Sequence, residues 1–177
     1  MNVPRWLRRL FRAPYDGLRH FGVVSEGVLY RCGQPTPAQL EDLITRLSLK
    51  SVVSLRGTRE ADDPDGWEQG ERAVCERRGV EFVPIPCNHK NPPTADQVER
   101  FLDLTRRADK RPVLVHCRLG QQRTMLFCGL YRVRVEGMST ADALHEMDAG
   151  GFGTHVRRHR LLLSSFHEHS KAARPVA

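Results

Sequence analysis

Residues 112–124 read Pro-Val-Leu-Val-His-Cys-Arg-Leu-Gly-Gln-Gln-Arg-Thr, and this stretch decides the fold. Its first four residues are apolar, and a second apolar run follows at residues 125–131, so the pattern predicts a buried strand, a tight loop and a buried helix. Cys117 and Arg123 flank five residues of that loop. Successive backbone N–H groups in such a loop converge on one point, and the following helix adds the positive end of its dipole. The stretch therefore predicts a cradle for a phosphate group.

Several positions of this loop carry residue types suited to phosphate chemistry. The field that binds an anion also favours a thiolate, so Cys117 is the candidate nucleophile. Arg123 offers a planar fork that matches two phosphate oxygens, and Gly120 lets the loop turn without a side chain in the pocket. Together they predict hydrolysis of a phosphate ester through a cysteinyl-phosphate intermediate. The loop is expected to bind the phosphate through Arg118, Leu119, Gly120, Gln121, Gln122 and Arg123.

His116 and Thr124 border the loop and are expected to support it. His116 would orient the loop through hydrogen bonds. Thr124 could donate its hydroxyl to the thiolate or cap the following helix, and the two roles are compatible. Cys128 lies in the apolar helix and is expected to be inert packing. Because no cluster of His, Asp and Cys has the spacing of metal ligands, neither a metal nor another cofactor is expected.

Two stretches resemble a known family. The pattern His-Cys-x-x-Gly-x-x-Arg-Thr at residues 116–124 resembles the active-site motif of the protein tyrosine and dual-specificity phosphatase superfamily. Residues 27–35, Gly-Val-Leu-Tyr-Arg-Cys-Gly-Gln-Pro, resemble the opening of small atypical dual-specificity phosphatases of the plant-and-fungi type and their bacterial relatives. The likeness runs from about Phe21 to about His169. It implies a cysteine-dependent phosphatase acting on protein phosphotyrosine, phosphoserine or phosphothreonine, or alternatively on inositol polyphosphates or pyrophosphates.

The general acid is missing from the place that the resemblance implies. Relatives commonly carry an Asp in the loop after the strand that ends here near Ile85, but residues 86–93 contain no carboxylate. Asn88 stands about where the plant-and-fungi type has this Asp, and an amide cannot donate the proton. We favour His89, since histidine titrates near neutrality. The alternatives are a substrate that needs no acid, or a carboxylate from Asp96, Asp62, Asp63 or Asp65.

The sequence leaves the substrate and two other functions open. Arg118 matches a Lys in relatives that act on inositol phosphates, and Lys90 and Arg56 could contact further phosphates with it. Gln121 and Gln122 replace basic residues of those relatives, which weakens the polyphosphate interpretation. A pseudophosphatase would bind phosphate without efficient turnover. A thiol redox or arsenate-reducing enzyme would need a second cysteine near the loop.

Composition predicts one compact domain and an anionic partner. The 177 residues are 40% hydrophobic, which suits one domain with its own core. The net charge of +7 favours a phosphorylated protein or a small polyanionic phosphate as the partner. Nucleic acid is not expected, because aromatic residues make up only 7% and no nucleic-acid-binding motif is present. Five irregularly spaced cysteines favour a reducing compartment, hence the cytoplasm, and we expect a monomer.

We predict three segments: a basic tail at residues 1–20, a phosphatase domain at 21–170 and a C-terminal tail at 171–177. Residues 5–12 alternate basic and bulky apolar side chains. They could lie on an anionic membrane as a short amphipathic helix, but one or two turns bury too little for stable anchoring. We therefore favour a tail that packs its apolar side chains against the domain.

Strands alternating with helices predict an α/β fold, with a mainly parallel sheet of about four to five strands flanked by helices. Ligands on such sheets bind beyond the carboxyl ends of the strands, so the loops after residues 55, 85 and 116 are expected to meet. Besides a hairpin at residues 23–30, the strands are predicted at 51–55, 80–85 and 113–116. The helices are predicted to begin after Thr36 and Thr94, and to span residues 67–78, 124–135, 139–147 and 154–169.

Overall fold

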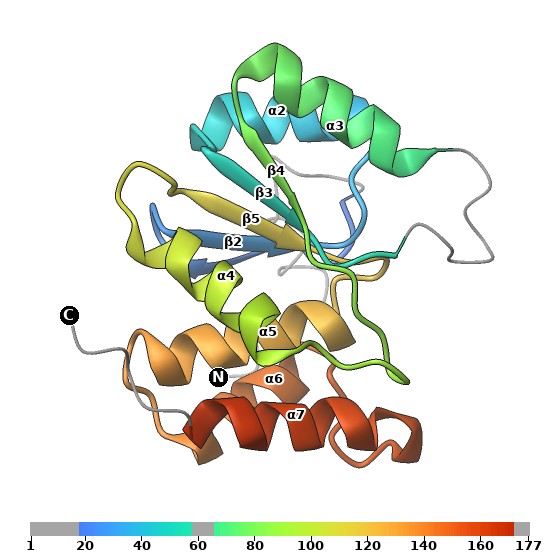
Figure 1. The fold of residues 1–177 in the computed structure, drawn as a ribbon, viewed down its shortest axis with the longest axis vertical. Helices are drawn as coiled ribbons and strands as arrows, with labels where there is room; N and C mark the ends of the chain where they lie inside the picture. Colours follow the sequence, from blue (N-terminus) through green and yellow to red (C-terminus); the bar gives the residue numbers. More distant parts are fainter. Residues whose placement is uncertain (1–17, 58–65, 172–177) are drawn as a thin grey trace, which may run out of the picture.

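A computed structural model describes residues 18–57 and 66–171 and contains one five-stranded sheet (Figure 1). The strand order is β1-β2-β5-β3-β4, and only the β1–β2 pair is antiparallel. This architecture confirms the predicted α/β class with a mainly parallel sheet. The strands are β1 (Gly22–Ser25), β2 (Leu29–Cys32), β3 (Ser51–Ser54), β4 (Glu81–Pro84) and β5 (Val113–His116).

The middle strand β5 is buried along its whole length, as expected for its apolar sequence. Its last residue, His116, pairs with Cys32 on one side and with Ser54 on the other. Three neighbouring parallel strands therefore end at the same level. Since the chain leaves all three at one edge, the loops that follow start close together, and the cysteine loop after β5 lies between the other two.

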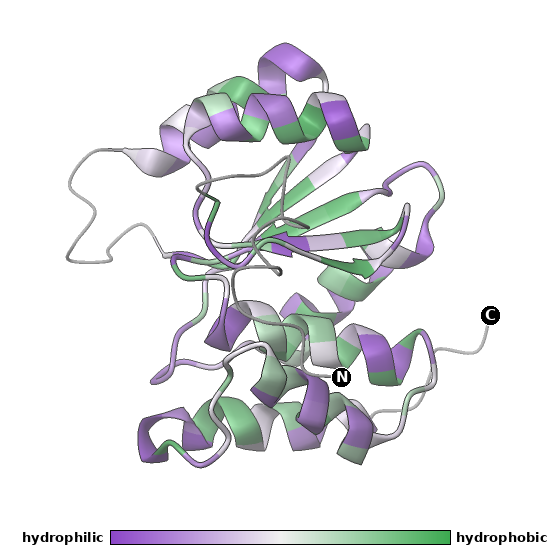
Figure 2. Ribbon diagram, turned by 180° about the vertical axis from the view of Figure 1, so that it is seen from behind, coloured by the Kyte–Doolittle hydropathy of each residue, from purple (hydrophilic) through white to green (hydrophobic). Residues whose placement is uncertain are grey.

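Helices cover both faces of the sheet, which gives the fold three layers (Figure 1). Val113 and Val115 belong to the larger hydrophobic cluster and Leu114 to the smaller one, as the alternation of a strand requires. Figure 2 shows the hydrophobic colour following the strands and the sides of the helices that approach them. On the face with the smaller cluster lie α2 (Pro37–Leu47) and α3 (Trp67–Arg78); on the other lie α4 (Ala95–Arg106), α5 (Gln122–Arg134), α6 (Thr140–Ala149) and α7 (Arg160–Lys171).

The predicted capping of two helices is confirmed. The Thr36 side chain accepts a hydrogen bond from the backbone N–H of Gln39 at 3.2 Å, and the Gln39 side chain accepts one from the backbone N–H of Thr36 at 2.9 Å. Thr94 begins α4 with the same reciprocal pair. Gly79 ends α3 with φ of 65°, a conformation that glycine adopts without strain.

The predicted helix at residues 154–169 begins later than the sequence pattern indicates. Asp148, near the end of α6, accepts hydrogen bonds from the backbone N–H of Thr154 at 2.7 Å and from its hydroxyl at 2.5 Å. These bonds hold Thr154 in a loop. The chain then forms a short 3-10 turn, η1 (Arg157–His159), before α7 starts at Arg160. This late start places residues 157–159 at the edge of the pocket described below.

The predicted tails lie mostly outside the described residues, including the segment at residues 5–12. Arg19 and His20 are described and attached to the domain, although we assigned them to the tail. The Arg19 carbonyl accepts a hydrogen bond from the Gly33 N–H at 2.6 Å, and the His20 carbonyl accepts one from Arg31 at 3.0 Å. Within the described ranges, no helix has the length and apolar character needed to cross a bilayer.

Candidate active site

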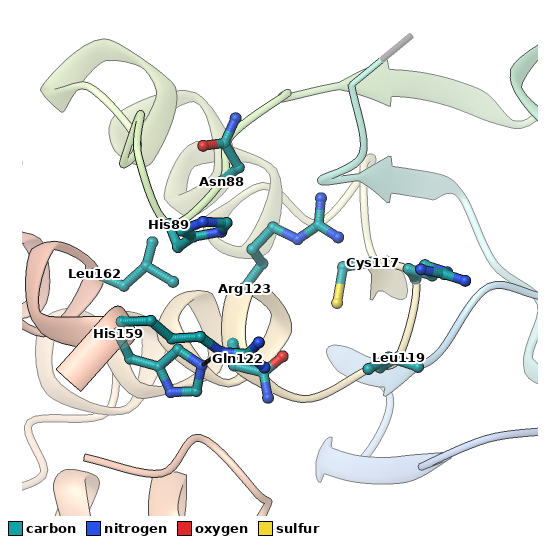
Figure 3. A pocket seen from close by; sticks show the side chains of 10 residues that line it. Asn88, His89, Cys117, Leu119, Gln122, Arg123, His159 and Leu162 are labelled. Atoms are coloured by element: carbon teal, nitrogen blue, oxygen red, sulfur yellow. Dashed lines mark hydrogen bonds between the residues drawn. The ribbon is translucent and has the colours of Figure 1, made fainter. Parts of the chain in front are cut away.

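A pocket with a cavity volume of about 330 Å³ lies at the carboxyl ends of the strands (Figure 3). Its walls come from the loop after β4, from the cysteine loop with the first turn of α5, and from the turn that precedes α7. Of the three loops that we expected to meet, those after β4 and β5 line the pocket. The loop after β3 joins them through a hydrogen bond between Arg123 and Leu55. The lining residues are Asn88, His89, Cys117, Arg118, Leu119, Gln122, Arg123, Arg158, His159 and Leu162.

Cys117 follows β5 directly and is only 2% exposed. Its Sγ accepts a hydrogen bond from the backbone N–H of Gly120 at 3.3 Å. Figure 3 shows the sulfur directed into the pocket, between Arg123 and Leu119. A backbone N–H that approaches the sulfur from within the loop favours negative charge at this point.

Gly120 is required where the cysteine loop packs against the end of β2. Its φ is +73°, and a Cβ atom there would lie 2.5 Å from the carbonyl carbon of Cys32 and from the nitrogen of Gly33. The next residue, Gln34, donates its backbone N–H to the Arg118 carbonyl at 3.1 Å. The two motifs that resemble one family, residues 27–35 and 116–124, therefore pack against each other.

Arg123 lies in the first turn of α5 and contacts the loops on both sides of the cysteine loop. Its Nη1 donates to the carbonyl of Leu55, after β3, at 3.2 Å and to that of Cys87, after β4, at 3.3 Å. These bonds hold the guanidinium beside Cys117 at the pocket (Figure 3). An arginine held in place in this way needs little reorganisation to bind an anion.

His116 lies beside a buried carboxylate that the sequence did not indicate. His116 and Glu71 are 0% and 1% exposed, and 3.1 Å separates His116 Nε2 from Glu71 Oε1. The distance is that of an ion pair but the direction is not that of a hydrogen bond. Glu71 also accepts a hydrogen bond from the Gln34 amide at 2.7 Å, and Gln34 in turn accepts one from Arg56 at 2.9 Å. The guanidinium of Arg56 stacks over the ring of Trp67, 4.4 Å from its centroid.

Thr124 and His116 do not make the contacts that we expected of them. Helix α5 begins at Gln122 with Gln121 as its N-cap, so Thr124 does not cap it. The Thr124 hydroxyl and both ring nitrogens of His116 are buried, and none of them has a hydrogen-bond partner among the described residues. Thr124 lies in the first turn of α5, the same turn that carries Arg123.

The candidates for the general acid differ in where they lie. His89 is exposed and lines the pocket, as does Asn88. The Asn88 side-chain oxygen accepts hydrogen bonds from the backbone N–H groups of Lys90 at 2.8 Å and Asn91 at 3.0 Å, so it holds its own loop in shape. Asp96 is exposed in the first turn of α4 and does not line the pocket. The other candidates, Asp62, Asp63 and Asp65, lie outside the described residues.

The basic residues near the pocket are partly those we expected. Arg118 lines the pocket, whereas Arg56 and Lys90 do not. Arg56 is 4% exposed and contacts Gln34 and Trp67 instead. Arg158 and His159 also line the pocket. We missed both, because a basic run at residues 157–160 is usually a solvated face, and only the late start of α7 brings it to the pocket.

The other four cysteines are buried and free. Burial raises the pKa of Cys128 to about 12 and that of Cys75 to about 12. The pKa of Cys32 is also raised well above its ordinary value, by burial and by the neighbouring charge of Glu71. These three side chains are therefore thiols at neutral pH. Among the described residues, no group of three or more His, Cys, Asp or Glu side chains could hold a metal ion.

The fold and the cysteine loop define the class of protein to which the chain belongs. A sequence model for the family described as "DSP-PTPase phosphatase fused to NAD+ Kinase" matches residues 19–160, and the chain belongs to this family.

Individual relatives agree with this membership. The dual specificity protein phosphatase TpbA of Pseudomonas aeruginosa (strain UCBPP-PA14) is 34% identical over 125 residues, which are 71% of this chain and 52% of that protein. The chain thus spans about half the length of this curated relative. The crystal structure of P. aeruginosa TpbA is 27% identical, covers 90% of this chain and 96% of its own, and has a TM-score of 0.64. The catalytic core of the PP-IP phosphatase SIW14 from Saccharomyces cerevisiae shares the fold, with 20% identity, 83% and 85% coverage and a TM-score of 0.65.

Proposed function

We propose that the protein is a cysteine-dependent phosphatase that hydrolyses phosphate monoesters through a cysteinyl-phosphate intermediate. The observation that carries the proposal is the meeting of the Cys117 sulfur, the Gly120 N–H and the Arg123 guanidinium at one pocket. A nucleophile, a backbone donor and a planar cation are the three groups that phosphoryl transfer to a thiolate uses.

In the first step the Cys117 thiolate attacks the phosphorus atom. The S–P bond forms and the P–O bond to the leaving group breaks, so the electron pair goes to the leaving oxygen. The loop N–H groups and Arg123 stabilise the negative charge on the remaining phosphate oxygens. Because carbonyls of two other loops already orient Arg123, its fork is in place before the substrate arrives.

His89 is the residue that we propose as the proton donor to the leaving oxygen. It lies at the pocket, and an imidazole can both donate and accept a proton. Asn88 cannot take this role, because an amide has no acidic proton to donate, and its side-chain oxygen accepts from the backbone of its own loop. In the second step water attacks the phosphorus and gives its proton to the same histidine. The S–P bond then breaks, and its electron pair returns to sulfur.

For the substrate we propose proteins that carry phosphotyrosine, phosphoserine or phosphothreonine. The relative TpbA is named as a dual specificity protein phosphatase, which supports this class. A small polyanionic phosphate, such as an inositol polyphosphate or pyrophosphate, is the alternative. Arg118 at the rim of the pocket favours it.

Rapid-quench kinetics with a radiolabelled aryl phosphate tests the proposal. One equivalent of label per chain should become covalently bound and then turn over, and Cys117→Ser should abolish both signals while phosphate still binds. Iodoacetate at pH 7 should label Cys117 first, with inorganic phosphate protecting it, because burial keeps Cys75 and Cys128 as thiols. Hydrolysis retained by Cys117→Ser would refute the covalent mechanism. Tight phosphate binding without turnover in the unmodified protein would identify a pseudophosphatase.

A further inference from the structure

Arg158 and His159 form a wall of the pocket that the reaction proposed above does not use. They come from the 3-10 turn before α7, about forty residues after the cysteine loop, yet they line the same cavity as Cys117. Arg158 is exposed, whereas His159 is 4% exposed and packs beside the ring of Phe152, with 6.0 Å between the ring centroids.

The hydrogen bonds of His159 determine its tautomer. Its Nδ1 lies 3.1 Å from the carbonyl oxygen of Gly153, and a carbonyl can only accept, so Nδ1 carries a proton. Its Nε2 lies 3.1 Å from Nε of Arg158, and a guanidinium can only donate, so Nε2 is the acceptor. A neutral imidazole therefore holds the guanidinium of Arg158 by one edge.

The other edge of that guanidinium is available. Within the part of the chain that the structure describes, the two Nη groups of Arg158 have no hydrogen-bond or ion-pair partner. An Arg side chain loses much conformational freedom when it is fixed on a ligand, and a buried histidine that holds Nε reduces this cost. Arg123 is similarly held at the pocket, in its case by two carbonyl groups that accept from its Nη1.

The size and charge of the pocket indicate more than one anion. A volume of about 330 Å³ falls within the range of small-molecule sites and exceeds what a single phosphate group fills. Arg118, Arg123 and Arg158 all line it, and no Asp or Glu is among the lining residues that the structure describes. Arg123 is assigned to the phosphate that reacts with Cys117, and Arg158 comes from a different segment, the turn before α7, so its guanidinium offers a second place for an anion.

We propose that Arg158, positioned by His159, is a second anion-binding site of this pocket, and that the substrate carries a second phosphate group close to the one that is hydrolysed. The inference rests on the proposed phosphatase function. The second phosphate can belong to a doubly phosphorylated peptide or to a small polyphosphate, because both present the same dianion to the guanidinium.

The test compares Arg158→Gln with Arg157→Gln, its exposed neighbour that does not line the pocket. Matched peptides with one or two phosphorylated residues are assayed at about 0.15 M salt, which screens general charge effects. Arg158→Gln should lower the ratio of kcat/KM for the doubly over the singly phosphorylated peptide about tenfold, as for one lost charged hydrogen bond. Arg157→Gln should leave that ratio unchanged. An equal loss on both peptides, or an unchanged ratio, would overturn the proposal.

Two substitutions at His159 separate positioning from packing. His159→Gln keeps an oxygen that can accept from Arg158, whereas His159→Asn keeps a donor for the Gly153 carbonyl and loses that acceptor. The Asn variant should show most of the Arg158→Gln loss and the Gln variant less than half of it, with circular dichroism verifying that both fold. The same loss in both variants would show that His159 only packs.

A binding measurement keeps this inference separate from the catalytic proposal. In full-length Cys117→Ser, calorimetry with the doubly phosphorylated peptide and with inositol hexakisphosphate should show about tenfold weaker binding when Arg158→Gln is added. The probe that loses more affinity identifies the source of the second phosphate. If the unmodified protein shows no turnover but binding still depends on Arg158, the catalytic proposal is refuted and the site remains. No loss with either probe would refute the site.

Discussion

Glu71 is the residue at which one substitution should damage both the stability and the chemistry of the protein. It is 1% exposed in α3, accepts a 2.7 Å hydrogen bond from Gln34 and lies 3.1 Å from His116, the residue before the nucleophile. In Glu71→Ala, the Gln34 side-chain nitrogen keeps only its 3.2 Å bond to the Pro35 carbonyl, and His116 loses its neighbouring carboxylate.

The size of the effect follows from these contacts. Glu71→Ala leaves the Gln34 side-chain nitrogen and the His116 ring each short of a buried partner, and each such loss costs about 1–3 kcal/mol in the free energy of unfolding. For a chain of this length each kcal/mol lowers Tm by about 2–4 °C, so a loss of about 2–6 kcal/mol should make Glu71→Ala melt roughly 4–24 °C lower. Glu71→Gln retains an acceptor for Gln34 and adds an unpaired buried N–H group where Glu71 Oε2 has no hydrogen-bond partner, at a cost of about 1–3 kcal/mol.

Catalysis should fall as well. The network of Gln34, Glu71 and His116 supports the end of β5, directly before Cys117. A displacement of about 1 Å in a catalytic group can reduce the rate about 100-fold. We expect kcat/KM of Glu71→Ala for an aryl phosphate to fall about 10- to 100-fold, measured well below its Tm. Glu76→Ala, an exposed change on the same helix, should stay within about 0.5 kcal/mol of the unmodified protein. If Glu71→Ala melts within 2 °C of the unmodified protein and keeps full activity, the network does not support the site.

Three further outcomes test the roles of single residues. Arg123→Lys should lose at least about 100-fold in kcat, because an ammonium cannot bind both the loop carbonyls and a phosphate in a fork; a few-fold loss would show that Arg123 is not the clamp. His89→Ala should slow hydrolysis of alkyl phosphates about 100-fold or more and barely affect hydrolysis of aryl phosphates. If Asp96→Asn shows this dependence on the leaving group instead, Asp96 is the general acid. Gly120→Ala should be inactive and more than about 2 kcal/mol less stable, whereas Gly27→Ala, at φ of +68° in open space, should cost only about 1–2 kcal/mol in an unfolding titration.

Local rules account for most of the fold that the sequence predicted. The four residues of β5, the capping boxes at Thr36 and Thr94, and the stop at Gly79 depend on neighbours a few positions away. The start of α7 was predicted wrongly because Asp148 holds Thr154 in a loop, and the pairing of an exposed Asp with a Thr six residues later leaves no periodic signal.

In the candidate site, too, the residues that were predicted lie close together in sequence, and the residues that were missed do not. Cys117, Arg123 and Gly120 lie within one short loop, so their spacing alone indicated a phosphate cradle. Glu71 and Arg158 were missed because their relation to that loop arises only when distant elements pack together. A Glu on the inner side of an amphipathic helix is the one signal that could have pointed to Glu71, since carboxylates are almost never fully buried unless they are paired.

Groups far apart in sequence therefore surround the active site on both faces of the sheet. On the side of α2 and α3, Gln34 and Glu71 lie behind His116. On the side of α5 and α7, Arg123 spans the neighbouring loops and His159 holds the guanidinium of Arg158 at the pocket. Because the first group contacts the strand end and the second faces the cavity, changes in the first should alter reaction of every substrate, and changes at the α7 side should alter the choice among substrates. Comparing Glu71→Gln with Arg158→Gln on singly and doubly phosphorylated peptides would distinguish the two effects directly.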